Sequence, residues 1–261
     1  MAPAFVVLQS CVPVRAEPSH RAEQVTQLLF GETFTLAEEA GDWLAIRCTY
    51  DEYPGWVPRN QVDLTAQAPA TPPRWFTAPV QLVTLATPGS EAPHEVWAWL
   101  GSCFPGTVHE ELAFFELGER QVLTSATHLV SSLPVPEAFR AVGHLVGAPY
   151  LWGGRSVPGI DCSGLTQLFA RLCGVRLRRD AGEQVTQGDE IAFDARKPGD
   201  LVFFNNAEGK ITHVGLVNEN IGTVLHASGS VRVDYLHENG IRHRENNSIT
   251  HHLHSTRRIL G

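Results

Sequence analysis

The sequence has 261 residues, of which 43% are hydrophobic and 18% are charged, and its formal net charge at pH 7 is −8. This length suggests about two domains or three small ones, and the composition is typical of a folded chain. The negative charge excludes general binders of nucleic acid or anionic surfaces, which use clustered Lys and Arg. No run approaches the roughly 18 apolar residues of a spanning helix, so we expect no membrane segment.

The start of the chain predicts a cytoplasmic location. It has no basic segment, and its apolar run from Phe5 to Leu8 is shorter than the roughly 7–15 apolar residues of a secretion signal. The cysteines are odd in number and have no CxxC spacing; they are Cys11, Cys48, Cys103, Cys162 and Cys173. Neither a zinc ribbon nor a full disulfide framework is therefore indicated, and we expect reduced thiols.

Residues 4 to 64 read as short strands separated by turn residues. The expected strands are Phe5–Leu8, Val12–Val14, Val25–Phe30, Thr33–Leu36, Trp43–Arg47 and Gly55–Val57. This close spacing predicts a small antiparallel barrel. The run Thr65–Arg74 is rich in Pro and Ala and predicts a linker.

Residues 75 to 130 predict a second, less regular barrel. The expected strands are Val80–Leu85, Val96–Leu100 and Gln121–Thr124. Trp97 and Trp99 alternate with Ala98, so they share one face of their strand, and we expect that face to be the core. A second linker runs from Ser131 to Pro136, and Pro136 is suited to the first turn of a helix that reaches about Val146.

Cys162 lies near the end of the glycine-rich stretch Tyr150–Gly164, in the first turn of a predicted helix. Apolar residues recur at helical spacing after it, at Leu165, Leu168, Phe169 and Leu172. Gly174 is the expected stop, which predicts a helix over Asp161–Cys173. Free N–H groups and the helix dipole favour an anion in the first turn, so we expect a thiol pKa below the usual value of about 8.5. The alternative is a buried cysteine that serves as a small apolar residue.

Two histidines lie on strands that follow. Thr212–Val217 and Thr223–Ala227 predict antiparallel neighbours, on which His213 and His226 lie opposite each other or one diagonal step apart. A cysteine nucleophile needs a base, and the base needs a third group to orient it. A lone histidine is more often structural, but a pair placed beside a cysteine at a helix start favours a catalytic site.

Five short motifs, in this order and spacing, resemble the NlpC-type cysteine peptidases. They are Tyr150-x-Trp-Gly-Gly, Asp161-Cys-Ser-Gly, Pro198-Gly-Asp-Leu-Val-Phe-Phe, Thr212-His-Val-Gly and Val224-Leu-His-Ala. The resemblance covers residues 136–261 and implies a papain-like α+β domain with the cysteine at a helix start packed on an antiparallel sheet. It implies that Cys162 attacks a carbonyl, His213 is the general base and His226 orients it. Tyr150 would help to hold the oxyanion.

The first barrel also resembles a known family. Val14-Arg-Ala-Glu-Pro-Ser, Leu28-Leu-Phe-Gly-Glu, Gly41-Asp-Trp and Gly55-Trp-Val are similar to bacterial SH3-like domains attached to cell-wall enzymes. We therefore expect an SH3-like domain at residues 1–66 and a second, divergent one at residues 74–131. The expected fold class is multi-domain, with two small all-β SH3-like barrels followed by the α+β papain-like domain.

This domain order looks like the γ-D-glutamyl-diamino acid endopeptidases of muropeptide recycling. Such enzymes cut murein stem peptides that carry a free N-terminal L-Ala. The resemblance implies that Asp161 holds the substrate amine and Ser163 assists it, although an aspartate at this position also suits a helix cap. Asp180 would line the far side of the pocket. Ala181 stands where some relatives carry a small hydroxyl residue.

Further contacts to the amine and to L-Ala are expected from the first SH3-like domain. Glu23 and Tyr53 are the candidates, with Glu17 as the alternative acid. We expect no cofactor and no metal, since His252 and His254 alternate on a terminal strand without a ligand motif. The alternatives are a secreted or wall-bound hydrolase of polymeric peptidoglycan and an inactive peptide-binding protein. The sequence leaves open the oligomeric state and whether the diamino acid is lysine or diaminopimelate.

Overall fold

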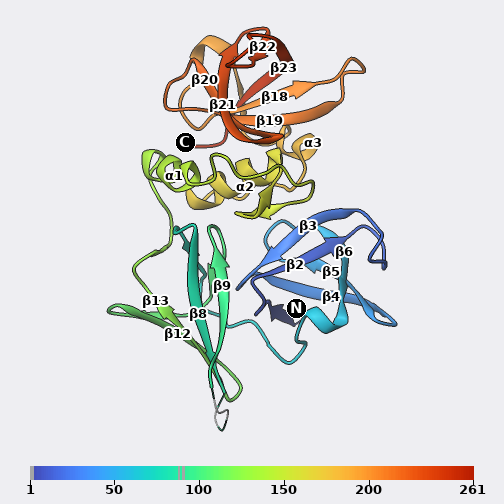
Figure 1. Cartoon of the computed structure of the whole chain (residues 1–261), viewed down its shortest axis with the longest axis vertical. Coiled ribbons are helices and arrows are strands. Elements are labelled where there is room, and N and C mark those ends of the chain that lie inside the picture. Colours follow the sequence, from blue (N-terminus) through green and yellow to red (C-terminus); the bar gives the residue numbers. More distant parts are fainter. Residues whose placement is uncertain (1–2, 88, 90–91) are drawn as a thin grey trace. The chain divides into compact units, whose positions relative to one another are not determined.

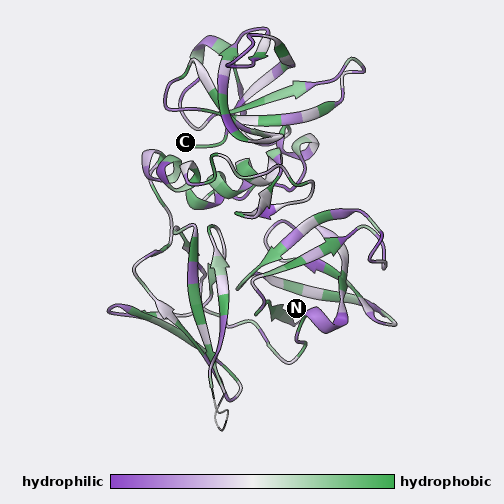
Figure 2. Ribbon diagram, in the orientation of Figure 1, coloured by the Kyte–Doolittle hydropathy of each residue, from purple (hydrophilic) through white to green (hydrophobic). Residues whose placement is uncertain are grey.

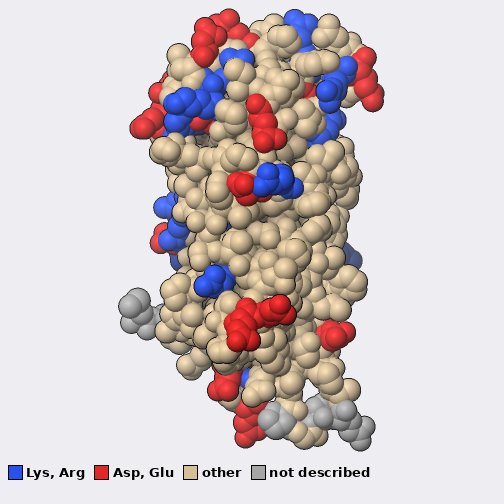
Figure 3. Space-filling view, turned by 90° about the vertical axis from the view of Figure 1, so that its left-hand side faces the viewer, with Lys and Arg blue, Asp and Glu red and all other residues tan. Residues whose placement is uncertain are grey.

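The computed structural model describes residues 3–87, 89 and 92–261. The chain divides into two compact units, Met1–Ser132 and Leu133–Gly261 (Figure 1). The first unit contains strands β1 to β14, and the second contains helices α1 to α3 with strands β15 to β23. No helix in the described part of the chain is long and apolar enough to cross a lipid bilayer. On the face drawn in Figure 3, Lys and Arg side chains are interspersed with Asp and Glu.

The first six strands form one antiparallel sheet in the order β1-β4-β5-β6-β2-β3. They are β1 (Ala4–Val6), β2 (Cys11–Arg15), β3 (Gln24–Leu29), β4 (Thr33–Ala40), β5 (Trp43–Cys48) and β6 (Pro54–Pro58). Alternation sets the inside of this barrel: along β2, Val12 and Val14 are buried and their neighbours are not. Each strand predicted for this segment is present.

A five-stranded and a three-stranded sheet follow, in the orders β11-β12-β13-β8-β9 and β10-β7-β14. Their strands are β7 (Arg74–Phe76), β8 (Val80–Ala86), β9 (His94–Trp99), β10 (Cys103–Phe104), β11 (Thr107–His109), β12 (Leu112–Leu117), β13 (Arg120–Ser125) and β14 (Leu129–Val130). Along β12, buried and exposed residues alternate regularly. Figure 2, which is coloured by hydropathy, shows apolar and polar residues interspersed along the strands. The sequence analysis did not predict β12, because apolar residues occupy both of its faces.

The prediction that Trp97 and Trp99 form the core of this sheet is wrong. Val96 and Ala98 are buried, whereas Trp97 is 51% exposed and its ring stacks on that of Trp99 with centroids 6.0 Å apart. The interior is already occupied by large rings, including Phe104. Small residues of β9 therefore face inward, and the indoles face outward.

The strands of the first unit share a core across the predicted linker. Phe30 of the first barrel packs in one cluster with Phe76 and Phe104. The N–H of Cys103 donates to the carbonyl of Phe30 at 3.0 Å, and a side chain at Gly31, whose φ is +76°, would clash with the Cys103 backbone. Ala66, the second residue of the predicted linker, is buried, and its carbonyl accepts from the Val6 N–H. The bounds of two separate SH3-like domains remain a prediction.

The second unit packs helices against a seven-stranded sheet in the order β17-β23-β18-β19-β20-β21-β22 (Figure 1). Its helices are α1 (Val135–Gly143), α2 (Cys162–Leu172) and α3 (Ala181–Gln184). Its strands are β15 (Arg155–Ser156), β16 (Gly159–Ile160), β17 (Asp189–Ile191), β18 (Leu201–Asn205), β19 (Ile211–Val217), β20 (Thr223–Ser228), β21 (Ser230–His237), β22 (Gly240–Arg242) and β23 (Ile249–Arg258). Because β22 also pairs with β23, the strands from β18 to β23 close into a barrel.

Helix α2 is buried along its full length, and its ring at Phe169 packs on Phe139 of α1 with centroids 4.7 Å apart. Gly174 follows the helix with a φ of +81°, which agrees with the expected stop. At the other end, a two-stranded hairpin of β15 and β16 leads directly into Asp161 and Cys162. The hairpin therefore positions Cys162 at the start of the helix.

Candidate active site

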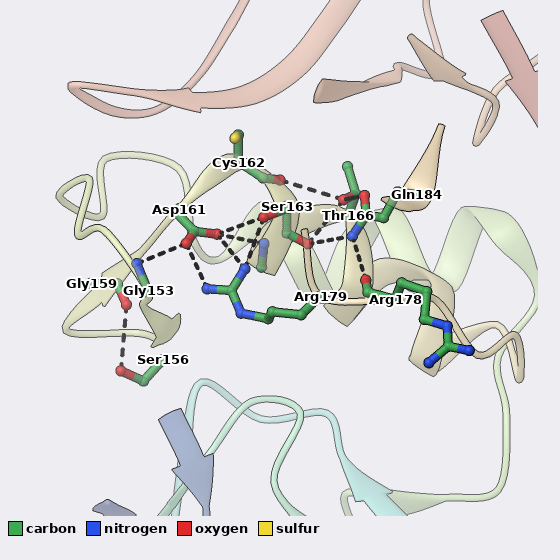
Figure 4. Close-up of polar contacts among 11 residues, drawn as sticks. Gly153, Ser156, Gly159, Asp161, Cys162, Ser163, Thr166, Arg178, Arg179 and Gln184 are labelled. Carbon is green, nitrogen blue, oxygen red and sulfur yellow. Dashed lines mark hydrogen bonds and ion pairs between the residues drawn. The ribbon is translucent and has the colours of Figure 1, made fainter. Parts of the chain in front are cut away.

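Cys162 is the first residue of α2, and its side chain is buried. The backbone N–H groups of Val214 and Ser163 donate to its thiol. Val214 follows His213 in β19, so this contact brings the helix start to the strand that carries the predicted base. Figure 4 shows the sulfur pointing away from the Asp161 and Arg179 side chains.

The predicted lowering of the thiol pKa is wrong. Burial raises the pKa of Cys162 to about 12, and the negative charge of Asp161 adds to this rise. The N–H groups of Val214 and Ser163 act in the opposite direction but do not outweigh the loss of water. Without substrate, Cys162 is therefore a protonated thiol at neutral pH and needs a base at the moment of attack.

His213 and His226 lie in contact on β19 and β20. His213 Nε2 is 2.9 Å from His226 Nδ1, and the two rings meet edge to face with centroids 5.1 Å apart. The strands pair antiparallel through Leu216 and Leu225, which places the histidines on a diagonal as one of the predicted alternatives has it. Burial lowers the pKa of His213 well below its usual value, and the charge of His226 adds to this. A neutral imidazole is the form that accepts a proton.

Two residues that the sequence analysis missed complete the surroundings of this pair. Oδ2 of Asp234, on β21, lies 3.1 Å from Nε2 of His226. His251 of β23 stacks on the His213 ring with centroids 4.2 Å apart. A turn at Gly229, with a φ of +73°, joins β20 to β21 and was the available sequence signal for Asp234. His251 depends on the closure of β22 onto β23, which no local pattern reveals.

Tyr150 lies at the edge of the site. Its N–H donates to the Gly229 carbonyl at 3.0 Å, beside the turn that joins β20 to β21. Burial raises the pKa of its hydroxyl, and the charges of Cys162 and Asp161 add to this rise. The phenol therefore stays protonated and lies within electrostatic reach of the thiol. A hydrogen-bond donor to the oxyanion needs both properties.

Asp161 caps α2 and pairs with a buried arginine (Figure 4). Its Oδ1 accepts from the Gly164 N–H at 2.7 Å, and its Oδ2 accepts from the Gly153 N–H at 2.9 Å. Arg179, which is 1% exposed, donates to both oxygens at 3.0 and 2.6 Å. Ser163 donates to Oδ1 at 3.2 Å and accepts from Arg179. The capping role of Asp161 is thus present, and its carboxylate is already surrounded by donors.

The remaining predicted contacts lie in two places. Asp180 precedes α3, is exposed, and acts through its charge on the neighbouring Arg179, while Ala181 begins the helix. Glu23 is exposed in the first unit, and Tyr53 packs against the core of the first barrel. The roles of Glu23, Tyr53 and the alternative Glu17 in substrate binding remain predictions.

Comparison with known proteins identifies the family. Residues 147–251 match the NlpC/P60 family, and residues 14–62 match the bacterial dipeptidyl-peptidase SH3 domain. The chain is 31% identical over 217 residues to the gamma-D-glutamyl-L-lysine dipeptidyl-peptidase of Bacillus subtilis, which covers 77% of this chain and 71% of that protein. It is 26% identical over 227 residues to the protein of the same name from Bacillus cereus, which covers 79% and 68%.

Structural comparison supports the same fold. A crystal structure of an NlpC/P60 family protein from Bacillus cereus matches with a TM-score of 0.82 at 19% identity, covering 99% of this chain and 100% of that one. The fold is therefore that of an SH3 domain joined to a papain-like domain. With a cysteine at the start of α2 and a histidine pair on the facing sheet, the chain belongs to the NlpC/P60 family of cysteine peptidases.

Proposed function

We propose that this peptidase cuts the bond between γ-D-glutamate and the following diamino acid in murein stem peptides that carry a free N-terminal L-Ala. The observation that carries the proposal is the similarity, over most of the chain, to two gamma-D-glutamyl-L-lysine dipeptidyl-peptidases. A dipeptidyl-peptidase removes two residues from an amino terminus, which requires that the terminus be free. Their names favour lysine as the diamino acid. We place the reaction in cytoplasmic recycling of cell-wall peptides.

The buried site supports a general-base mechanism. His213 is neutral because burial holds its pKa low, and it takes the thiol proton as the Cys162 sulfur attacks the γ-carbonyl. The carbonyl oxygen becomes an oxyanion, for which the first-turn N–H groups of α2 and the Tyr150 hydroxyl are suitable donors. Protonated His213 then gives its proton to the departing amine of the diamino acid. Water hydrolyses the thioester through the same base.

Recognition of the amine is assigned to acidic residues. Asp161 and Ser163 remain the proposed contacts beside the cysteine, but the carboxylate of Asp161 already holds Arg179 and two N–H groups. Asp161 therefore contributes its charge through this network rather than as an open carboxylate. Exposed Asp180 is proposed for the far side of the pocket, and Glu23 with Tyr53 for the L-Ala end.

Mass spectrometry of peptide products tests the proposal. The substrates are L-Ala-γ-D-Glu-L-Lys and its diaminopimelate counterpart, each with a free and with an acetylated amino terminus. We expect release of L-Ala-γ-D-Glu from the free peptides, faster for the lysine form, and little cleavage after acetylation. Cys162→Ala is the inactive control. Equal turnover of acetylated peptides would contradict the role given to the amine.

Intact sacculi distinguish the proposal from its main alternative. A secreted or wall-bound hydrolase would release peptides from polymeric peptidoglycan, where the stem L-Ala amine is blocked by its bond to the glycan. We expect sacculi to remain uncut under conditions in which free peptides turn over. Strong cleavage of sacculi would contradict the proposed role in recycling and favour a role in wall hydrolysis. The proposed peptidase chemistry would be unaffected.

A further inference from the structure

We propose that Asp234 is a fourth member of the catalytic array, a positioning residue that fixes the ring tautomers of His226 and, through it, of His213. The proposal rests on the proposed roles of Cys162 and His213 and extends them by one residue. It starts from an unbroken line of contacts, in which Asp234 Oδ2 lies 3.1 Å from His226 Nε2 and His226 Nδ1 lies 2.9 Å from His213 Nε2.

Asp234 is held firmly in this line. It is 2% exposed, and its Oδ2 also accepts from Arg232 Nε at 2.8 Å, while its Oδ1 accepts from the Arg244 N–H at 3.0 Å. Burial raises the pKa of this carboxyl, but the hydrogen bonds from His226, Arg232 and Arg244 lower it below its usual value. Asp234 is therefore ionised, and an ionised carboxylate is only an acceptor.

The proton positions follow from that single fact. His226 must carry its proton on Nε2 to donate to Asp234, and because the ring is neutral its Nδ1 then has the lone pair. His226 Nδ1 accepts from His213 Nε2, which leaves the lone pair of His213 on Nδ1. That atom is the base available to the Cys162 thiol, and the proton moves from Sγ to Nδ1.

The reversed arrangement would disable the base. If His226 carried its proton on Nδ1, it would donate to His213, whose own proton would then occupy Nδ1. His213 would meet the thiol with an N–H and accept nothing from it. Asp234 prevents this state, because the reversed ring would turn a lone pair toward a carboxylate.

Asp234→Asn leaves the other charged or titratable groups around the pair in the chain. They are Arg232 on the same strand, His243 in the segment after β22, His251 on β23, and Cys162 at the start of α2. Arg232 also donates to the Ser228 carbonyl at 2.6 Å, so its position does not depend on Asp234 alone. A difference in activity or tautomer between the wild type and the variant therefore reports the loss of the Asp234 carboxylate.

Asp234→Asn tests the proposal, with Asp200→Asn as the matched control. Asp200 is also buried and holds an arginine and a backbone N–H, since it accepts from Arg258 at 2.7 Å and from Lys197 at 2.6 Å. We expect Asp234→Asn to lower kcat by about 10²–10⁴-fold with little change in KM. The acid limb of kcat/KM, which reports protonation of the histidine base, should shift to lower pH, because loss of the negative charge destabilises the histidine cation. Asp200→Asn should leave both unchanged.

The tautomers themselves are measured by ¹⁵N NMR of histidine-labelled enzyme, which needs no substrate. We expect protons on Nε2 of both His213 and His226 in the wild type, and mixed tautomers in Asp234→Asn. Protons on Nδ1 of His226 in the wild type would overturn the proposal even if the variant fails to fold. Equal losses of activity in Asp234→Asn and Asp200→Asn would also overturn it. Failure to cut the proposed peptides would leave this measurement intact and would count only against the proposed function.

Discussion

Cys162 shows how burial and helix position compete at one atom. The start of α2 offers a favourable field for a thiolate, yet removal of water dominates and raises the thiol pKa to about 12. The sulfur is consequently unreactive until a neutral base removes its proton. Such a site protects a cysteine from adventitious alkylation and oxidation when no substrate is bound.

Alkylation by iodoacetamide reports this state of Cys162. Because the raised pKa keeps the thiolate fraction small, we expect the rate at this residue to rise steadily from pH 6 to pH 10 without levelling off near neutrality. Peptide mass spectrometry follows the residue, and Cys162→Ser identifies the background from other cysteines. A plateau below pH 8 would indicate a thiolate–imidazolium pair in the resting enzyme.

Buried neutral histidines make the fold sensitive to acid. The pKa of His251 falls to about 4 through burial, followed by the charges of His226 and Arg232, while an unfolded histidine titrates near 6.5. The unfolded chain therefore binds more protons than the folded one between these values. The stability that neutral His251 contributes is fully present above pH 6.5 and is lost as the pH falls toward 4.

His251→Phe tests that dependence, since a phenyl ring preserves the stack on His213 without a titrating group. We expect the variant to lose less stability than the wild type between pH 7 and pH 4, by up to about 3 kcal/mol. Urea unfolding at both pH values measures the difference. His254→Phe, at an exposed position of β23, is the control and should behave as the wild type. Identical losses of stability between pH 7 and pH 4 in all three proteins would show that His251 does not cause the acid sensitivity.

Helix α2 depends on the ion pair at its amino end. Asp161 and Arg179 are both buried, and Arg179 donates hydrogen bonds to the two Asp161 oxygens at 2.6 and 3.0 Å, so each charge has a partner. Removing one charge from such a pair costs about 3–5 kcal/mol, because the other remains buried. The same pair positions Ser163 and, through the cap, the first turn that carries Cys162.

We therefore expect Asp161→Asn to lower the free energy of unfolding by about 3–5 kcal/mol. Glu137→Gln is the control, since it removes the exposed pair with Arg140 on α1 and should cost about 0–1 kcal/mol. Urea unfolding followed by circular dichroism compares them. If both variants lose the same stability, the buried network is not what holds α2 in place.

Sequence patterns predicted α2 better than they predicted its surroundings. The apolar face from Leu165 to Leu172 and the stop at Gly174 define that helix through short-range spacing. Alternation placed Trp97 and Trp99 on one face of β9 but could not say which face is inside, because packing of distant rings decides this. Asp234 and His251 were missed for a related reason: their roles depend on strand pairing rather than on local sequence.

At the scale of the first unit, one hydrophobic cluster joins the two sets of strands, while the first barrel also has a core of its own. Phe30 from the first barrel packs with Phe76 and Phe104 from the later strands, beyond the Pro-rich segment that predicted a boundary. Arg120 also pairs with Asp63 at 2.6 Å across that segment. The two sets of strands should therefore open together.

Hydrogen exchange of the full chain tests this cooperativity. Phe30→Ala should cost about 3–5 kcal/mol and raise exchange in both β2–β6 and β8–β13, because the lost ring belongs to their shared core. Trp97→Ala is the control, since its exposed side chain should leave exchange nearly unchanged. Faster exchange confined to the first barrel would show two independent domains.

The barrel of the second unit limits how a peptide can be held. Every strand from β18 to β22 has a partner on both sides, but β19 pairs with β20 only through Leu216 and Val217, so the part of β19 at His213 has no described strand beside it on that side. The Val214 N–H there donates to the Cys162 thiol, so a ligand cannot extend the ladder at this point, a common mode of peptide recognition, without displacing the cysteine. It must be held by side chains and by its own termini, which suits the proposed substrate, because a γ-linkage and a D-residue interrupt the repeat of an ordinary strand.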